Sequence, residues 1–109
     1  MSTPAMGKKM ARLKDRVALI TGAGNSIGRA VAMAFAREGA DLILHFEEEG
    51  QRTAVADLTR DLERMGRRAL SQRVDITNAD GAYGLVETAV TGLGRVDILV
   101  NNAGLRPAI

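Results

Sequence analysis

Apolar residues of the chain alternate between short continuous runs and stretches with helical spacing. Four runs of aliphatic and β-branched residues, bounded by glycine or polar residues, predict buried strands at residues 16–21, 41–46, 69–74 and 96–101. Between these runs, apolar residues recur every three or four positions, which predicts three amphipathic helices. The predicted order is therefore β-α-β-α-β-α-β with short connections.

Each predicted helix has one apolar face. These faces consist of Ile27, Ala30, Val31, Ala34 and Phe35 in the first helix, of Val55, Leu58, Leu62 and Met65 in the second, and of Val86, Ala89, Val90 and Leu93 in the third. Thr77 or Asn78 is expected to cap the third helix, and Gly81 and Gly84 are expected to weaken its first turns.

Near-continuous apolar strands joined by helical crossovers predict an α/β fold with a parallel sheet covered on both faces. In a doubly wound, Rossmann-type sheet, right-handed crossovers give the strand order 3-2-1-4. The third strand is the least apolar and suits the edge of the sheet, and the fourth is left with an unpaired edge, so the sheet is incomplete on its C-terminal side. Because the order reverses between strands 1 and 4, a ligand crevice is expected above their carboxyl ends. The segments "TGAGNSIG" and "NNAG" both fall there.

Composition narrows the class of protein. A chain of 109 residues with 46% hydrophobic and 26% charged residues has the composition of one ordinary globular domain. The net charge of +2 is concentrated near the N-terminus, and aromatic residues make up only 3%, which disfavours nucleic-acid binding. No apolar run is long enough to cross a membrane. Residues 1–14 are expected to form a flexible leader before a folded unit at 15–109, and a cytoplasmic location is expected by elimination, since cysteine is absent.

The glycine-rich turn after the first strand predicts a phosphate site. A strand that ends in glycines and turns into a helix leaves backbone N–H groups unpaired, and the positive end of the helix dipole favours an anion. Gly22 permits the tight turn, and Gly28 allows the helix to pack closely on the sheet. With Gly24, the spacing is one residue longer than the common dinucleotide fingerprint, and no Lys-Ser or Lys-Thr pair indicates a P-loop. A glycine-rich turn without a ligand is the alternative.

Three segments in this order resemble the short-chain dehydrogenase/reductase family: "TGAGNSIG" at 21–28, "VDIT" at 74–77 and "NNAG" at 101–104. The loop of that family is Thr-Gly-x-x-x-Gly-x-Gly, which accounts for the longer spacing. Its fourth strand ends in Asp-x-Leu-Val-Asn-Asn-Ala-Gly, matched here from Asp97 to Gly104. The resemblance extends from about Leu13 to the end of the chain, and it implies the N-terminal, cofactor-binding half of such an enzyme.

The resemblance also implies roles for single residues. Thr21 would help to tie the loop to the fourth strand, and Asp75 would bind the adenine amino group with Ile76 near the base. A solvated acid or a helix cap is the alternative for Asp75. The pyrophosphate and its ribose would be surrounded by Gly22, Gly24, Asn25, Ser26, Ile27 and Gly28, and the ribose region would be lined by Asn102, Ala103 and Gly104.

Two positions bear on how strongly the cofactor binds and on the choice between NAD and NADP. Ser26 replaces a glycine usual in the family; at a helix N-cap its hydroxyl could accept an N–H bond, although its Cβ restricts close approach. Phe46 stands where an acid would select NAD, and it resembles members that carry an aromatic residue and often use NADP. Glu47, Glu48 and Glu49 follow, however, and their carboxylates would repel a 2′-phosphate. Both NAD and NADP therefore stay open as the cofactor.

The family's chemistry is hydride transfer between nicotinamide and a small carbonyl or alcohol substrate, with a serine and a Tyr-x-x-x-Lys pair as catalytic residues. Tyr83 is followed by Glu87, so it does not match and is expected to pack, partly buried, on the third helix. His45 is expected to be a packed or edge histidine, and no metal site is expected.

The sequence therefore predicts the cofactor-binding half of a homo-oligomeric NAD(P)-dependent oxidoreductase, a fragment that is inactive by itself and has neither a nucleic-acid nor a membrane partner. A non-catalytic dinucleotide-binding regulatory or scaffold module is the alternative. A methyltransferase-like sheet also uses a glycine loop, but "NNAG" argues against it.

Overall fold

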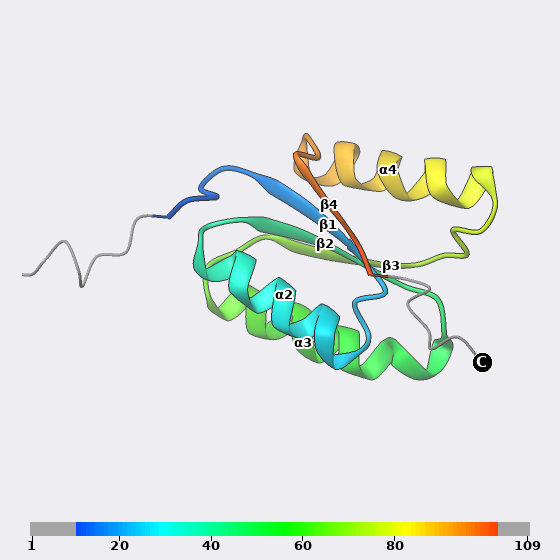
Figure 1. Ribbon diagram of the computed structural model, residues 1–109, viewed down its shortest axis with the longest axis horizontal. Helices are drawn as coiled ribbons and strands as arrows, with labels where there is room; N and C mark the ends of the chain where they lie inside the picture. Colours follow the sequence, from blue (N-terminus) through cyan, green and yellow to red (C-terminus); the bar gives the residue numbers. More distant parts are fainter. Residues whose placement is uncertain (1–10, 103–109) are drawn as a thin grey trace, which may run out of the picture.

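The computed structural model of the protein describes residues 11–102. A parallel sheet lies between α2 and α3 on one face and α4 on the other (Figure 1). The strands are β1 (Val17–Thr21), β2 (Asp41–Phe46), β3 (Ala69–Arg73) and β4 (Ile98–Asn101). The helices are α2 (Ser26–Arg37), the short 3-10 helix η1 (Glu49–Gln51), α3 (Arg52–Arg64) and α4 (Ala79–Leu93).

The order of the strands in the sheet is β3-β2-β1-β4, and every pairing is parallel. This confirms the predicted α/β class and the order 3-2-1-4. In register, Ile20 of β1 lies beside Leu44 of β2 and Val100 of β4. Among the described residues β3 forms one edge and β4 the other. The chain reverses its winding between β1 and β4, so the carboxyl ends of these two strands frame the expected crevice.

Alternating strand residues supply two apolar cores. Ile20 and Leu44 pack toward α2 and α3, where Leu58 and other residues of α3 are fully buried. Leu19 and Ile43 point to the opposite face and pack against α4. Because successive residues of a strand face opposite sides, these aliphatic runs are buried by helices on both faces.

The buried face of α2 differs from the predicted one. Gly28, Ala32 and Ala36 face the sheet, whereas Ile27, Ala30 and Ala34 are exposed. Small residues four positions apart let the helix axis come close to the strands. A Cβ built on Gly28 would lie 2.8 Å from the carbonyl oxygen of Gly22. The prediction was wrong for Ile27, Ala30 and Ala34, whereas Val31 and Phe35 are partly buried and pack against the core. The close contact turns Gly28, Ala32 and Ala36 toward the sheet, one position around the helix from Ile27, Val31 and Phe35.

A similar correction applies to α4. Leu85, Ala89 and Leu93 are buried, but Val86 and Val90 are each 48% exposed. Tyr83, which was expected to be partly buried, is 74% exposed. The true face is rotated by one position relative to the predicted one. The spacing of apolar residues in α4 is compatible with a face through Leu85 or with one through Val86. The larger leucines fill the space over β1 and β2.

The geometry at the start of α4 explains why a glycine stands at position 81. Asn78 is the N-cap, and its Oδ1 accepts a hydrogen bond from the Gly81 N–H at 2.8 Å. A Cβ on Gly81 would lie only 1.9 Å from the carbonyl oxygen of Asp75. Gly81 is therefore required by close contact with the segment after β3, whatever its cost in helix propensity.

The segment before β1 contacts the end of α2. The Leu13 N–H donates to the Glu38 carbonyl oxygen at 2.7 Å, and the Arg12 N–H donates to the Glu38 side chain. Residues 1–10 of the expected leader lie outside the described residues. Among residues 11–102, no helix is both long and apolar enough to span a membrane.

Candidate functional site

The glycine loop joins β1 to α2 at the carboxyl end of the sheet. Gly22 has φ of +65°, in the left-handed region that favours glycine. Asn25 is the N-cap of α2, and its Oδ1 accepts a hydrogen bond from the Gly28 N–H at 2.8 Å. Ser26 is thus the first helical residue, and the capping role considered for its hydroxyl belongs to Asn25.

Two amides at the start of α2 face outward without a partner. The N–H groups of Ser26 and Ile27 donate to no acceptor within residues 11–102. Unpaired amides at a helix N-terminus, together with the helix dipole, favour an anionic group such as a phosphate. The exposed side chain of Ile27 provides an apolar surface beside them. A cavity of about 230 Å³ also opens between Gly24, Ser26 and α3.

The residue that follows β4 is bonded to this loop. Asn102 is buried, and its backbone N–H donates to Thr21 Oγ1 at 2.9 Å. Its side-chain Nδ2 donates to the Gly22 carbonyl oxygen at 2.9 Å and approaches Asn25 Oδ1 at 3.2 Å. The structure thus brings Thr21, the loop and Asn102 together at the carboxyl ends of β1 and β4. Ala103 and Gly104 lie outside the described residues.

Asp75 and Ile76 follow β3 along the same edge of the sheet. Asp75 is exposed, and its Oδ1 accepts hydrogen bonds from the side chain and the backbone N–H of Thr77, at 2.6 and 2.8 Å. These bonds stabilise the carboxylate and lower the pKa of Asp75. Ile76 is half-buried against the α4 core. Asp75 is therefore a solvent-facing, ionised hydrogen-bond acceptor.

The end of β2 carries a charged cluster that sequence reasoning missed. Phe46 is buried, and the Arg52 guanidinium lies 5.4 Å from the centre of its ring. Arg52 donates two hydrogen bonds to Glu49, and Arg73 lies 3.6 Å from Glu49 Oε1. These arginines, Arg52 first, lower the pKa of the Glu49 carboxyl. One of the three glutamates is therefore paired with cations. Arg52 at the start of α3 and Arg73 at the end of β3 are the sequence features that could have indicated this cluster.

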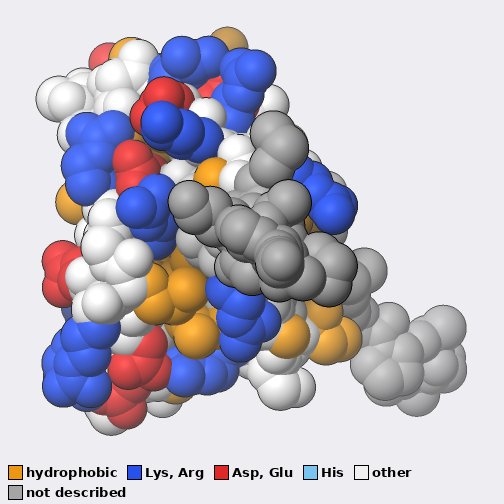
Figure 2. Space-filling model, turned by 90° about the vertical axis from the view of Figure 1, so that its left-hand side faces the viewer, with side chains coloured by type: hydrophobic (Ala, Val, Ile, Leu, Met, Phe, Trp, Pro, Cys, Tyr) orange, Lys and Arg blue, Asp and Glu red, His pale blue; other side chains and the backbone are white. Residues whose placement is uncertain are grey.

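The opposite end of the sheet is rich in charge but is not organised for one ligand. In Figure 2, Lys and Arg side chains gather over this face, interspersed with Asp and Glu. Several are ion-paired there: Arg68 with Asp41 at 2.9 Å and Arg95 with Asp97 at 2.7 Å. Paired cations of this kind do not form a free basic patch.

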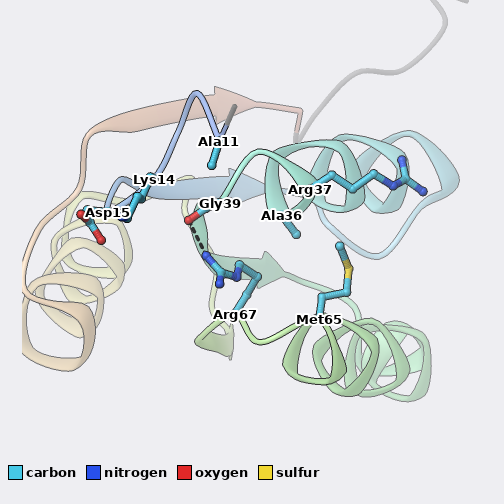
Figure 3. A pocket seen from close by; sticks show the side chains of 8 residues that line it. All are labelled: Ala11, Lys14, Asp15, Ala36, Arg37, Gly39, Met65 and Arg67. Carbon is cyan, nitrogen blue, oxygen red and sulfur yellow. Dashed lines mark hydrogen bonds between the residues drawn. The ribbon is translucent and has the colours of Figure 1, made fainter. Parts of the chain in front are cut away.

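A cavity of about 490 Å³ lies at that end, between the end of α2 and the end of α3. Arg67 donates from its guanidinium to the Gly39 carbonyl oxygen at 2.7 Å, while the Arg37 side chain points away from both residues (Figure 3). The cations lining this cavity therefore do not converge on a common point. The glycine loop is the better candidate for a binding site.

A doubly wound parallel sheet with open helix amides at its switch point defines the class of nucleotide-binding α/β proteins. Residues 16–108 match the family model described as short chain dehydrogenase, and the chain belongs to this family. The 7alpha-hydroxysteroid dehydrogenase of Escherichia coli K12 is 39% identical over 93 residues, which cover 85% of this chain and 35% of that protein.

The chain is also similar to solved structures. A blue fluorescent protein from a metagenomic library, in complex with NADPH, matches with a TM-score of 0.84 and 35% identity, covering 90% of this chain and 40% of that one. An NAD⁺-bound xylitol dehydrogenase matches with a TM-score of 0.80 and 33% identity, covering 89% of this chain and 36% of that one. The chain thus spans well under half the length of the relatives it matches.

Proposed function

We propose that the whole protein is an oxidoreductase that uses NAD or NADP and transfers hydride between the nicotinamide and a carbonyl or alcohol carbon of a small molecule. The observation that carries this proposal is the pair of outward-facing amides of Ser26 and Ile27, held at the switch point by Asn25 and Asn102. Family membership and similarity to an NADPH-bound and an NAD⁺-bound protein support it.

In this proposal the loop from Gly22 to Gly28 holds the pyrophosphate. Asp75 accepts from the adenine amino group, with Ile76 beside the base, and residues 102–104 line the ribose next to the nicotinamide. The bound nicotinamide supplies or accepts the hydride. The described residues of this chain bind and orient the dinucleotide, and none of them, including the exposed Tyr83 on α4, is assigned a proton-transfer step.

Titration of NADH and NADPH, followed by cofactor fluorescence, tests the loop. Gly28→Ala places a Cβ 2.8 Å from the backbone of Gly22 and Ala23, which must shift the loop, so we expect roughly tenfold weaker binding or more. Gly84→Ala is the matched control, because its Cβ meets no atom within 4 Å, and it should bind as the wild type does. Equal affinities of all three proteins would refute the loop assignment.

Turnover by the whole protein tests the chemistry. Oxidation of NADH or NADPH in the presence of a panel of ketones and aldehydes is the expected result. Nucleotide binding without turnover across such a panel, and across the corresponding alcohols in the reverse direction, would instead indicate a non-catalytic dinucleotide-binding module.

A further inference from the structure

His45 is fully buried in β2, and both of its ring nitrogens are engaged. The Gly22 N–H donates to Nδ1 at 3.1 Å, and Nε2 lies 2.8 Å from the carbonyl oxygen of Val74. Because Nδ1 accepts a hydrogen bond, it carries no proton. Nε2 then carries the single ring proton and donates it to Val74. The two contacts assign one neutral tautomer to the ring.

The backbone of the same residue also holds the loop. The His45 carbonyl oxygen accepts a hydrogen bond from the Ala23 N–H at 2.7 Å. Two successive amides of the glycine loop, those of Gly22 and Ala23, therefore point toward β2. The carbonyl oxygen of Gly22, in the peptide group that joins it to Ala23, accepts a hydrogen bond from Asn102 Nδ2. The left-handed turn at Gly22 is thus fixed from β2 and from the end of β4 at once.

This clamp determines which amides remain for a ligand. With Gly22 and Ala23 bonded to His45, and Gly28 bonded to Asn25, the amides of the loop without an acceptor among the described residues are those of Gly24, Asn25, Ser26 and Ile27, the last two at the helix start. The Nε2 contact also bonds the ring to Val74, which directly precedes Asp75. One side chain therefore joins the turn after β1 to the segment after β3.

We propose that His45 is a positioning residue for the dinucleotide: its Nδ1 orients the Gly22 peptide so that the amides at the start of α2 face the pyrophosphate. The part of this inference that concerns nucleotide affinity rests on the proposed function. The part that concerns the shape of the loop is measurable without any ligand.

Two substitutions separate the bonds of His45. In His45→Asn, the amide oxygen stands near the position of Nδ1 and can still accept from the Gly22 N–H. In His45→Gln, the amide nitrogen reaches the position of Nε2 and can still donate to Val74. Each variant keeps one buried bond and loses the other, so we expect similar losses of stability. We expect nucleotide affinity within about twofold of the wild type for His45→Asn and roughly tenfold weaker for His45→Gln.

Ligand-free measurements complete the test. Because the chain has a single histidine, ¹⁵N NMR assigns its tautomer without ambiguity, and a protonated Nε2 is expected. Hydrogen exchange of the Gly22 amide should be slow in the wild type and in His45→Asn, and fast in His45→Gln. A protonated Nδ1, equal Gly22 exchange in both variants, or affinities that follow stability alone would overturn the inference. Failure of the wild type to bind NADH or NADPH, with the exchange pattern as expected, would overturn the proposed function and leave the loop role standing.

Discussion

The side-chain amide of Asn102 donates a hydrogen bond to the carbonyl oxygen of Gly22 at 2.9 Å, across 80 positions of sequence. The same nitrogen lies 3.2 Å from Asn25 Oδ1, so one NH₂ group faces two acceptors in a buried position. The ends of β1 and β4 are therefore joined by a side chain that must be a donor.

Asn102→Asp tests this requirement. The substitution keeps the shape but turns the donor into a carboxylate that faces two oxygen atoms, so we expect a loss of about 1–3 kcal/mol in the free energy of unfolding. Asn101→Asp is the control, because Asn101 is exposed and its Oδ1 already acts as an acceptor for Thr21. Urea denaturation measures both. Equal effects of the two substitutions would show that the Asn102 donor is not required.

Gly81 and Gly84 lie one turn apart in α4 and should respond oppositely to alanine. The Cβ of Gly81→Ala would lie 1.9 Å from the Asp75 carbonyl oxygen, a backbone atom, and we expect a loss of about 1–3 kcal/mol in the free energy of unfolding. The Cβ of Gly84→Ala meets nothing within 4 Å, so the better helix propensity should add about 0.5–1 kcal/mol. Thermal and urea unfolding of both variants decide this. A gain for Gly81→Ala would contradict the close contact.

The sequence predicts the order of elements and the place of the glycine loop, because strand periodicity and glycine turns are local signals. It predicts only part of the buried faces of α2 and α4: Ala89 and Leu93 are buried as expected, whereas Ile27 and Val86 are exposed. Gly28, Ala32 and Ala36 are less hydrophobic than Ile27, yet the close approach of helix and sheet buries them and leaves Ile27 exposed. The contacts of Asn102 and His45 with Gly22 span 80 and 23 positions, and no local pattern encodes partners so far apart. Within the Arg52 cluster, Glu49 and Arg52 are only three positions apart, whereas the contact of Arg73 with Glu49 depends on β2 and β3 meeting in the fold.

Asp97 should make the protein less stable in acid. Hydrogen bonds from the Arg95 side chain and then from the Val17 N–H lower its pKa below the ordinary value of 3.8. A carboxyl whose pKa is lower in the folded state binds fewer protons there than when unfolded. Its stabilising contribution is present above about pH 4 and is lost as the pH falls through the folded pKa.

Urea denaturation between pH 6 and about pH 3 measures this loss. Asp97→Asn should flatten the dependence on pH, and Arg95→Gln should flatten it in part, because the largest cause of the shift is removed while the Val17 bond remains. Unchanged slopes in both variants would mean that other carboxyls carry the acid sensitivity. A carboxyl titration by NMR reports the Asp97 pKa directly.

Arg52 and Glu49 should influence the choice between NADPH and NADH in opposite directions. Arg52 lies over the buried Phe46 ring at the end of β2, where an arginine accommodates a 2′-phosphate in sheets of this type. Glu49 holds it with two hydrogen bonds and competes for its charge. We therefore expect Arg52→Gln to weaken NADPH binding several-fold more than NADH binding. Glu49→Gln frees the guanidinium of Arg52 and should shift the ratio of the two affinities toward NADPH.

Arg60→Gln, in an exposed pair with Asp57 farther along α3, serves as the control for a lost positive charge. Fluorescence titration of both nucleotides gives the ratio for each variant, and equal changes for NADPH and NADH in Arg52→Gln would show that this arginine does not face the 2′-position.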